Sequence, residues 1–180
     1  AALLLVTHAL PDAAALGAGV AVLLDRQLAR VATPAELFAR PASRRVLHFL
    51  GLHVELRGTV HTPEVAQTAL GTLAITRTTL APGSSVRIGV RPGQLRLLPS
   101  ASPAAVEPAP HDDGATRSEG MAEVVQVQHT PDGPRVVVRL DDTELPVPVA
   151  SSADAPAIGA RVRLVVEGAT ADDPLPAFPV

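Results

Sequence analysis

The sequence predicts a mixed fold, in which an α/β segment over residues 1–51 precedes an all-β region over residues 52–180. Apolar runs alternate with helix signals in the first part, as in the strands and helices of an α/β sheet. Short strand-like runs separated by Gly, Pro and Asp turns fill the second part, which is typical of a small antiparallel barrel or sandwich. With 180 residues, 47% of them hydrophobic, the chain is long enough for one domain or two small ones.

Composition excludes several classes of function. The net charge is −3 and aromatic residues are 2% of the chain, so there is neither a basic footprint nor a stacking platform for nucleic acid. The absence of cysteine excludes disulfides and thiolate chemistry. All basic side chains other than histidine are arginine, and without lysine this chain has no P-loop and no lysine Schiff base. No apolar run reaches membrane-spanning length, and no secretory leader pattern is present.

The apolar run Leu3–Val6 stops at Thr7 and His8, which predicts a buried parallel strand with His8 at its carboxyl end. Ligands of open α/β sheets bind beyond these strand ends, so His8 is a candidate to bond a phosphate oxygen or a reacting water. The alternative is an ordinary loop histidine with a local partner. Because the chain starts at Ala1, inside this run, we expect it to be the C-terminal piece of a longer protein.

The following elements of the first part are a short helix, a second buried strand, a turn and a hairpin partner. In order, they are Ala13–Leu16 after Pro11-Asp12 and before Gly17 and Gly19, Val20–Leu24, Asp25-Arg26 and Gln27–Ala32. Thr33, followed by Pro34 and by Glu36 at the third helical position, forms a capping box. The predicted helices are Ala35–Arg40 and, after the cap at Ser43, Arg44–Leu50, which ends at Gly51.

The second part is a series of short predicted strands. They are Val54–Val60, Thr72–Thr78, Ser85–Val90, Gln94–Leu98, Met121–His129, Arg135–Leu140, Glu144–Val149 and Arg161–Glu167. Tight turns at Pro131–Gly133 and Asp141-Asp142 join the later strands. Pro146 and Pro148 lack backbone N–H groups and have the same parity, which predicts an edge strand. Residues 99–120, rich in Pro, Ala, Ser and Asp, predict a flexible loop, and in the Pro-rich tail from Thr170 Phe178 is a candidate docking residue.

The order of motifs in the first part resembles the end of the nucleotide-binding subunit of ABC importers. In that family a strand ends in a switch histidine, and a hairpin, a T-P-x-E-[LIV] helix and an R-P-A-[NS] helix follow, closing on F-[LIV]-G. The matching stretches here are Val6-Thr7-His8, Thr33-Pro34-Ala35-Glu36-Leu37, Arg40-Pro41-Ala42-Ser43 and Phe49-Leu50-Gly51. The second part resembles the appended transport-associated OB (TOBE) regulatory domain, with Gly58-Thr59-Val60 and Val90-Arg91-Pro92-Gly93-Gln94-Leu95 at its G-x-V and [IV]-R-P-E-x-[LI] signals.

The resemblance implies a C-terminal fragment of a P-loop NTPase α/β domain followed by an OB-like barrel. The parent would bind ATP and Mg²⁺, hydrolyse ATP between two copies of the subunit, and drive uptake of a small solute through transmembrane permease subunits at the cytoplasmic face of the membrane. His8 would contact the γ-phosphate and hold the attacking water in line. The P-loop and the other ATPase motifs lie upstream in the family, so this chain alone should neither bind these cofactors nor hydrolyse ATP.

Some positions depart from the family pattern. Ala9 replaces an acidic residue after the histidine, Ala18-Gly19 replaces an acidic-basic pair, and Gly93-Gln94 replaces E-D. Each change removes a polar partner, and together the changes are compatible with a diverged or weakly active parent. Residues 68–74 resemble a strand pair of the ferric-iron branch, and the S-A-R-N stretch of molybdate-type domains is absent. The resemblance therefore favours iron, polyamine or a related solute.

Several other polar clusters have both a functional and a structural interpretation. His48, His53 and His61 could hold a metal or be solvated strand-surface residues. Carboxylate pairs in turns could act as acid and base, or bond local backbone; they are Asp112-Asp113, Asp141-Asp142 and Asp172-Asp173. Arginines on neighbouring strands could form an oxyanion site at a dimer interface or a solvated face; they are Arg135, Arg139, Arg161 and Arg163. For Arg91 we expect a structural role, bonding loop carbonyls or a carboxylate.

The second hypothesis for the whole chain is a stand-alone OB-type module that binds a small oxyanion or a protein partner. The two capped helices of the first part favour the ATPase fragment, because a bare binding module has no need of them. The fragment hypothesis also predicts that residues 3–6 and 20–24 belong to a larger sheet, so their exposed apolar faces should promote self-association or fraying of the isolated chain.

Overall fold

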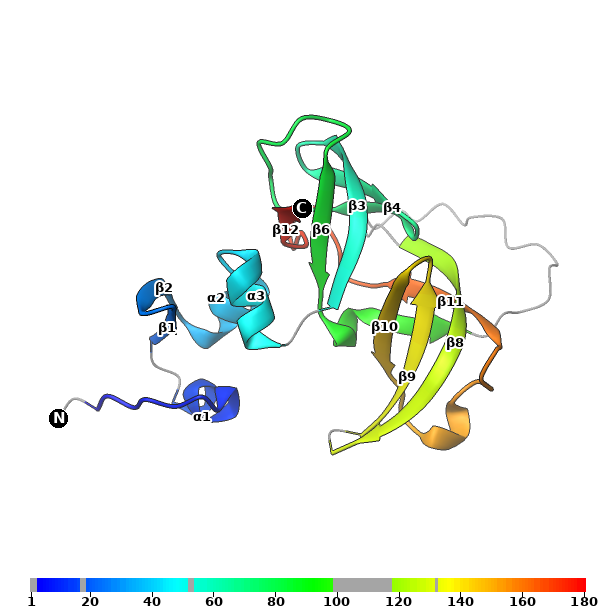
Figure 1. The fold of residues 1–180 in the computed structure, drawn as a ribbon, viewed down its shortest axis with the longest axis horizontal. Coiled ribbons are helices and arrows are strands. Elements are labelled where there is room, and N and C mark those ends of the chain that lie inside the picture. Colours follow the sequence, from blue (N-terminus) through cyan, green and yellow to red (C-terminus); the bar gives the residue numbers. More distant parts are fainter. Residues whose placement is uncertain (1–2, 17–18, 52–53, 99–117, 132) are drawn as a thin grey trace. The chain divides into compact units, whose positions relative to one another are not determined.

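The computed structural model describes residues 3–16, 19–51, 54–98, 118–131 and 133–180. The chain divides into two compact units, Ala1–His53 and Val54–Val180, and each is described by itself (Figure 1). No helix in the described ranges combines the length and apolar character that a membrane crossing needs.

The N-terminal unit contains one β-hairpin and three short helices. The elements are α1 (Leu10–Ala15), β1 (Val20–Leu24), β2 (Gln27–Ala32), α2 (Pro34–Ala39) and α3 (Arg44–Leu50). The hairpin turns at Asp25 and Arg26, which have φ angles of 49° and 65°, as a two-residue turn with both central residues left-handed requires. The predicted hairpin, its turn and both capped helices are therefore confirmed, with bounds that differ by one residue at each end of α2.

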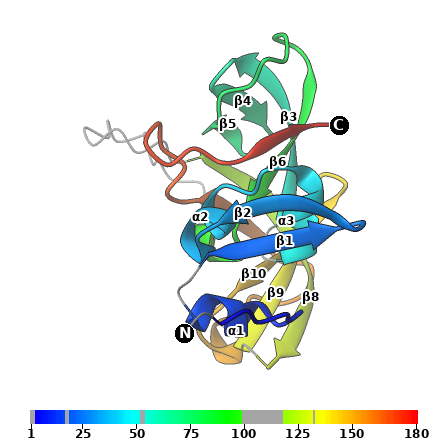
Figure 2. The ribbon, with the colours of Figure 1, turned by 90° about the vertical axis from the view of Figure 1, so that its left-hand side faces the viewer.

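A small apolar cluster holds the hairpin to the last two helices. Val22 of β1 packs with Leu37 of α2 and with Val46 and Leu50 of α3, and the hairpin lies across both helices in Figure 2. Arg45 on α3 also donates a hydrogen bond from Nη2 to Oδ2 of Asp25 in the hairpin turn. Only Val22 of β1 is fully buried, so the prediction of a buried strand at Val20–Leu24 is right about the strand and wrong about the burial of most of it.

The predicted buried parallel strand at Leu3–Val6 is wrong. These residues have no regular secondary structure, and Leu4 and Val6 are 89% and 87% exposed. The physical reason is that a parallel strand is buried only when neighbouring strands and helices cover it, and the described part of this unit offers one antiparallel hairpin. Helix α1 also begins at Leu10, before Pro11, rather than at Ala13; Gly17, expected to end it, lies outside the described residues.

The C-terminal unit consists of two five-stranded antiparallel sheets. One has the order β12-β6-β3-β4-β5 and the other β10-β9-β8-β11-β7. The first sheet comprises β3 (Val54–Thr62), β4 (Val65–Thr68), β5 (Gly71–Ala74), β6 (Ser85–Val90) and β12 (Ala177–Pro179). The second comprises β7 (Leu95–Leu98), β8 (Ser118–Thr130), β9 (Gly133–Leu140), β10 (Thr143–Pro148) and β11 (Arg161–Val166). Single turns of 3-10 helix lie at Pro92–Gln94 and Ser152–Asp154.

The chain passes from the first sheet to the second and back again. The chain leaves the first sheet after β6, adds β7 to the second sheet, and returns at its end to pair β12 with β6. Strand β10 lies at an edge of the second sheet, so the edge predicted from Pro146 and Pro148 is confirmed.

Several predicted boundaries in this unit are wrong. Residues 118–120, expected in a flexible loop, begin strand β8, where Ser118 Oγ donates to the Thr72 carbonyl of β5; the rest of that predicted loop, residues 99–117, lies outside the described residues. Strands β4 and β12 were not predicted at all. The run Thr72–Thr78 is a strand only as far as Ala74, and Gln94 belongs to the 3-10 turn before β7.

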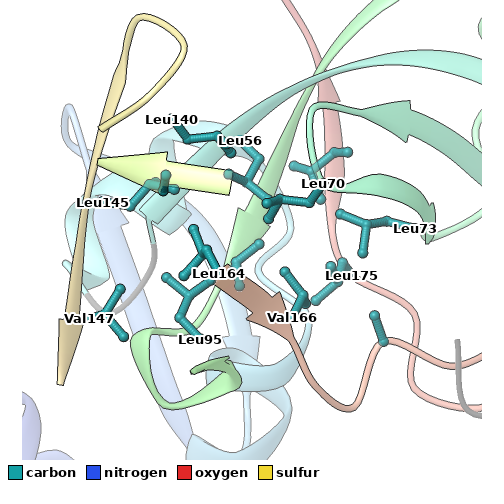
Figure 3. Close-up of a cluster of buried hydrophobic side chains, with 14 of the residues drawn as sticks. Leu56, Leu70, Leu73, Leu95, Leu140, Leu145, Val147, Leu164, Val166 and Leu175 are labelled. Carbon is teal, nitrogen blue, oxygen red and sulfur yellow. The ribbon is translucent and has the colours of Figure 1, made fainter. Parts of the chain in front are cut away.

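One hydrophobic core lies between the two sheets. Leu56, Leu73 and Ile88 from the first sheet pack in one cluster with Leu145 and Leu164 from the second, as the close-up in Figure 3 shows for most of this cluster. The alternation of buried and exposed residues along β3 and β6 turns one face of that sheet toward the core and the other outward. The predicted fold class, a mixed chain with an all-β barrel-like second part, is confirmed.

Candidate functional site

His8 lies in a bend between the extended N-terminal segment and helix α1. Its side chain is exposed, and the backbone N–H of the next residue, Ala9, donates to Thr7 Oγ1 at 3.0 Å. Among the described residues nothing hydrogen-bonds or ion-pairs with the His8 imidazole. The imidazole is therefore free to donate to or accept from a partner, but the described residues bring no second polar catalytic group to it.

An apolar depression of about 320 Å³ adjoins His8. Its lining is almost wholly hydrophobic and comes from the N-terminal segment, α1, β1 and α3; it includes Leu3, Leu5, Val6, Leu16, Leu23 and Phe49. Leu23 and Phe49 are 62% and 50% exposed, and Leu28 and Val31 on β2 are exposed as well. An exposed apolar surface of this extent is typical of a place where another surface or a ligand packs.

Two of the sequence motifs that carry the family resemblance contain the N-caps of helices in this unit, Thr33 for α2 and Ser43 for α3. Thr33 Oγ1 accepts from the Glu36 N–H at 3.3 Å, and Glu36 Oε2 accepts from the Thr33 N–H at 3.0 Å, which is the predicted capping box. The hydrogen bonds from the Thr33 backbone and side chain lower the pKa of the Glu36 carboxyl. Ser43 Oγ accepts from the Val46 N–H at 3.3 Å, so both motifs set where α2 and α3 begin.

Arg91 has the structural role that the sequence predicts. Its Nε donates to Gln94 Oε1 at 3.2 Å, and its Nη2 lies 3.3 Å from Oδ2 of Asp173. The same Gln94 oxygen accepts from the Arg91 N–H at 3.1 Å. Arg91 thereby ties the 3-10 turn before β7 to the loop that precedes β12, the two places where the chain passes between the sheets.

The predicted arginine cluster on the second sheet lies in an alternating row of charges. The register places Arg161 of β11 beside Glu123 of β8, and Glu123 beside Arg139 of β9. Arg139 Nη2 lies 3.5 Å from Oε1 of Glu144 on β10. Arg163, on the same strand as Arg161, lies 3.9 Å from Oε2 of Glu119. Carboxylates thus lie beside Arg139, Arg161 and Arg163, and the geometry favours a solvated charged face over an oxyanion site there.

The first sheet carries a basic groove that the sequence reasoning missed. Arg57 of β3 lies directly opposite Arg87 of β6, and both line a depression of about 460 Å³. The other residues that line the groove have uncharged side chains: Gly58, Thr59, Gln67, Thr68, Ala69, Ser85, Val86 and Val180. The alternation of the two strands could have shown that each arginine points outward, but only the register between the strands brings the two together.

The described residues hold no group of three or more His, Asp or Glu side chains that could bind a metal ion. His61 is exposed on β3, and His53 lies outside the described residues. Asp141, with a φ of 50°, forms the β9–β10 turn with Asp142, and Asp173 accepts from Arg91; these are structural uses of the carboxylates. Asp112-Asp113 lie outside the described residues.

Comparison with known proteins supports the resemblance seen in the sequence. Over 92% of its length the chain is 29% identical to the Fe(3+) ions import ATP-binding protein FbpC of Mesorhizobium japonicum, in an alignment of 184 residues. The alignment covers 46% of that relative, so the chain spans about half the length of the curated relative it matches. No protein-family model matches the chain.

The fold also has a counterpart among solved structures. A molybdate-bound crystal structure of the cytoplasmic molybdate-binding protein ModG superposes with a TM-score of 0.50 and 18% sequence identity. The match covers 77% of this chain and 98% of ModG. At this identity the likeness concerns the fold alone. Together the comparisons confirm the resemblance to an ABC importer ATP-binding subunit and the OB-like character of the β-rich part.

Proposed function

We propose that this chain is the C-terminal regulatory part of the ATP-hydrolysing subunit of an ABC importer for a small solute. The observation that carries the proposal is the alignment with an iron-import ATP-binding protein over 92% of the chain, which includes both compact units. A stand-alone barrel would explain only the second unit. The two capped helices and the hairpin of the first unit then need a larger protein to complete them.

The N-terminal unit fits a partial nucleotide site rather than a whole one. His8 offers an exposed imidazole without a partner among the described residues, which suits a hydrogen bond to a phosphate oxygen. The sequence has no lysine and supplies no P-loop. ATP and Mg²⁺ would therefore be held by residues upstream, and His8 would orient the attacking water and stabilise charge on the transferred phosphoryl group. The apolar surface beside His8 would pack against the preceding part of the same subunit.

The remaining parts of the proposal concern the solute and the partners. FbpC is named for Fe(3+) import, which together with residues 68–74 favours iron, polyamine or a related solute. ModG binds molybdate, but the S-A-R-N stretch of molybdate-type domains is absent here. We expect a homodimer of the intact subunit, bound to transmembrane permease subunits at the cytoplasmic face of the membrane, with residues 54–180 as its regulatory module.

The test is ATP hydrolysis by the intact gene product that contains this chain. The His8→Ala variant should lower kcat by about 10²–10³-fold, since a preorganised donor to the developing charge has been lost. The matched control is His61→Ala, because His61 is also exposed but lies on β3 of the other unit. Chain 1–180 alone should hydrolyse no ATP. Equal kcat values for the wild type and the His8→Ala variant would reject the assigned role of His8.

The second candidate function is a free-standing OB-type module that binds a small oxyanion. The groove over Arg57 and Arg87 favours it, because two arginines without carboxylate partners face one depression. This candidate needs no ATPase core. A gene product that lacks nucleotide binding altogether would favour this second function over the first.

A further inference from the structure

The starting observation is a pair of like charges in direct register. Arg57 and Arg87 are opposite residues of β3 and β6, and such pairs have Cβ atoms about 5 Å apart. Both positions belong to the outward set of their strands, since their neighbours Leu56 and Ile88 are buried in the core. Like charges directly opposite each other are unfavourable in a sheet, so this arrangement calls for a compensating negative charge.

No ion pair with the described residues supplies such a charge. Neither guanidinium group has an ion pair or hydrogen bond with them, and the Nε atom of Arg87 is buried without an acceptor. Glu55 occupies the preceding outward position of β3, and no ion pair within the described part joins it to Arg57 or Arg87. Strand β12 places Phe178 opposite Arg87 on the other side, which adds an apolar neighbour and no carboxylate.

Several other arginines of this unit do pair with carboxylates. On the second sheet Arg139 pairs with Glu144, Arg163 with Glu119 and Arg96 with Glu167. The arginine that links the two sheets, Arg91, pairs with Asp173. Arg57 and Arg87 thus differ from these strand arginines in facing each other without a carboxylate.

The lining of the groove suits an anion. Thr59 and Ser85 are opposite each other in the next outward row of β3 and β6, and Gln67 of β4 lies beside Thr59. Hydroxyl and amide groups can donate to an oxyanion, and a guanidinium fork matches two of its oxygens. The depression, about 460 Å³, leaves space for an anion with its first waters.

We propose that the groove over Arg57 and Arg87 binds a tetrahedral oxyanion of the phosphate or sulfate type, held by both guanidinium groups and by the hydroxyls of Thr59 and Ser85. The ion bridges the two strands and removes the repulsion between their arginines. The inference concerns residues 54–180 and holds whether or not the chain is part of an ATPase. Anion binding in this groove would couple the state of the β-rich unit to the concentration of the ion.

The first experiment titrates chain 1–180 with sodium phosphate at constant ionic strength, with chloride as the balancing anion. Calorimetry should show saturable binding, and amide NMR shifts should be largest in β3, β4 and β6. Arg57→Gln and Arg87→Gln should each weaken binding at least about 10-fold, as expected for loss of a charge-assisted hydrogen bond. The matched control is Arg161→Gln, an exposed arginine on the other sheet, which should bind as the wild type does.

A thermal unfolding series gives a second, independent readout. In chloride alone Arg57→Gln should melt at a higher temperature than the wild type, because the like-charge pair is gone. In saturating phosphate the order should reverse, since only the wild type gains the binding free energy. General stabilisation by phosphate as an excluded salt acts on all variants alike. The same difference between Arg57→Gln and wild type in both salts, or no saturable binding by the wild type, would overturn the proposal.

A parallel titration with ADP identifies the source of the oxyanion. Tighter binding of phosphate or sulfate than of ADP assigns the groove to a free inorganic ion. Tighter binding of ADP, lost in Arg57→Gln, assigns it to the phosphoryl groups of a nucleotide. Both results support an oxyanion site, and neither depends on ATP hydrolysis, so failure of this inference is distinguishable from failure of the proposed function.

Discussion

Replacing Gly120 by alanine tests how the first residues of β8 join the two sheets. An added Cβ would lie 2.8 Å from the Ala69 carbonyl oxygen and 2.8 Å from Leu70 Cδ2. Both neighbours are held in place, because Leu70 is fully buried and Thr68 Oγ1 bonds the Leu70 N–H and the Gly71 carbonyl across this turn. The turn between β4 and β5 therefore cannot move away at little cost.

The magnitude follows from two opposing contributions. Overpacking a well-filled site costs about 1–3 kcal/mol, and a backbone oxygen under 3 Å places this site in the upper part of that range. Alanine restricts the unfolded chain relative to glycine, which returns about 0.4–1 kcal/mol. We expect a net loss of about 1–2.5 kcal/mol in the free energy of unfolding, and a fall in the Tm of this unit of roughly 3–10 °C.

The assay is urea unfolding of chain 1–180 followed by far-UV circular dichroism, since the sequence has no Trp or Tyr. Gly93→Ala is the matched control, because a Cβ at Gly93 meets nothing within 4 Å; its free energy of unfolding should stay within about 0.5 kcal/mol of the wild type. If Gly120→Ala were as stable as Gly93→Ala, the close contact between β8 and the β4–β5 turn would be refuted.

Two further predictions concern the N-terminal unit. Thr33→Ala should remove the capping box of α2 and cost roughly 0.5–2 kcal/mol, measured by hydrogen exchange of the α2 amides. Because the pKa of Glu36 is lowered in the folded state, its contribution is present above the pKa of the unfolded carboxyl and is lost as pH falls through the folded pKa. Glu36→Gln should lack this pH dependence, whereas Thr33→Ala should only weaken it, because the backbone N–H of residue 33 still donates to the Glu36 carboxylate. Chain 1–180 should self-associate through its exposed apolar surface, and the double change Leu23→Glu with Leu28→Glu should shift it toward monomer in sedimentation velocity.

Controls distinguish these effects from general destabilisation. Met121→Glu changes a side chain that is also about half exposed, but on β8 of the other unit, and should leave self-association unchanged. Amides of β1 and β2 should exchange faster than those of β8 and β11. Equal protection of these two sets of amides in a monomeric wild type would contradict the prediction for the hairpin and its exposed surface. Unchanged hydrogen exchange of the α2 amides in Thr33→Ala at all pH values would contradict the prediction for the helix cap.

The sequence alone predicts correctly those features of the fold that depend on local chemistry. The caps at Thr33 and Ser43, the turn at Asp25 and the edge strand with Pro146 and Pro148 all have the predicted form. Each depends on side chains and backbone angles within a few residues, which the sequence displays directly. The prediction of the overall fold class rests on the order of these signals along the chain and on the family resemblance of the motifs that contain them.

The incorrect or missing predictions concern features that depend on contacts between distant parts of the chain. The apolar run Leu3–Val6 reads as a buried strand, but its burial requires strands that the described residues do not provide. Strands β4 and β12 have four and three residues, too few for a periodic pattern, and form because longer strands pair with them. The Arg57–Arg87 pair likewise depends on the register between β3 and β6, which no local signal fixes.

The most direct test of the proposed ATPase origin is to read the coding sequence immediately upstream of Ala1 in its native gene. The account predicts an open frame that encodes a G-x-x-x-x-G-K-[ST] loop and an L-S-G-G-Q-like signature before His8. That result would make His8 the residue to change in the intact subunit. A stop codon or an initiator directly before Ala1 would contradict the account, and the chain would then be a free-standing binding module.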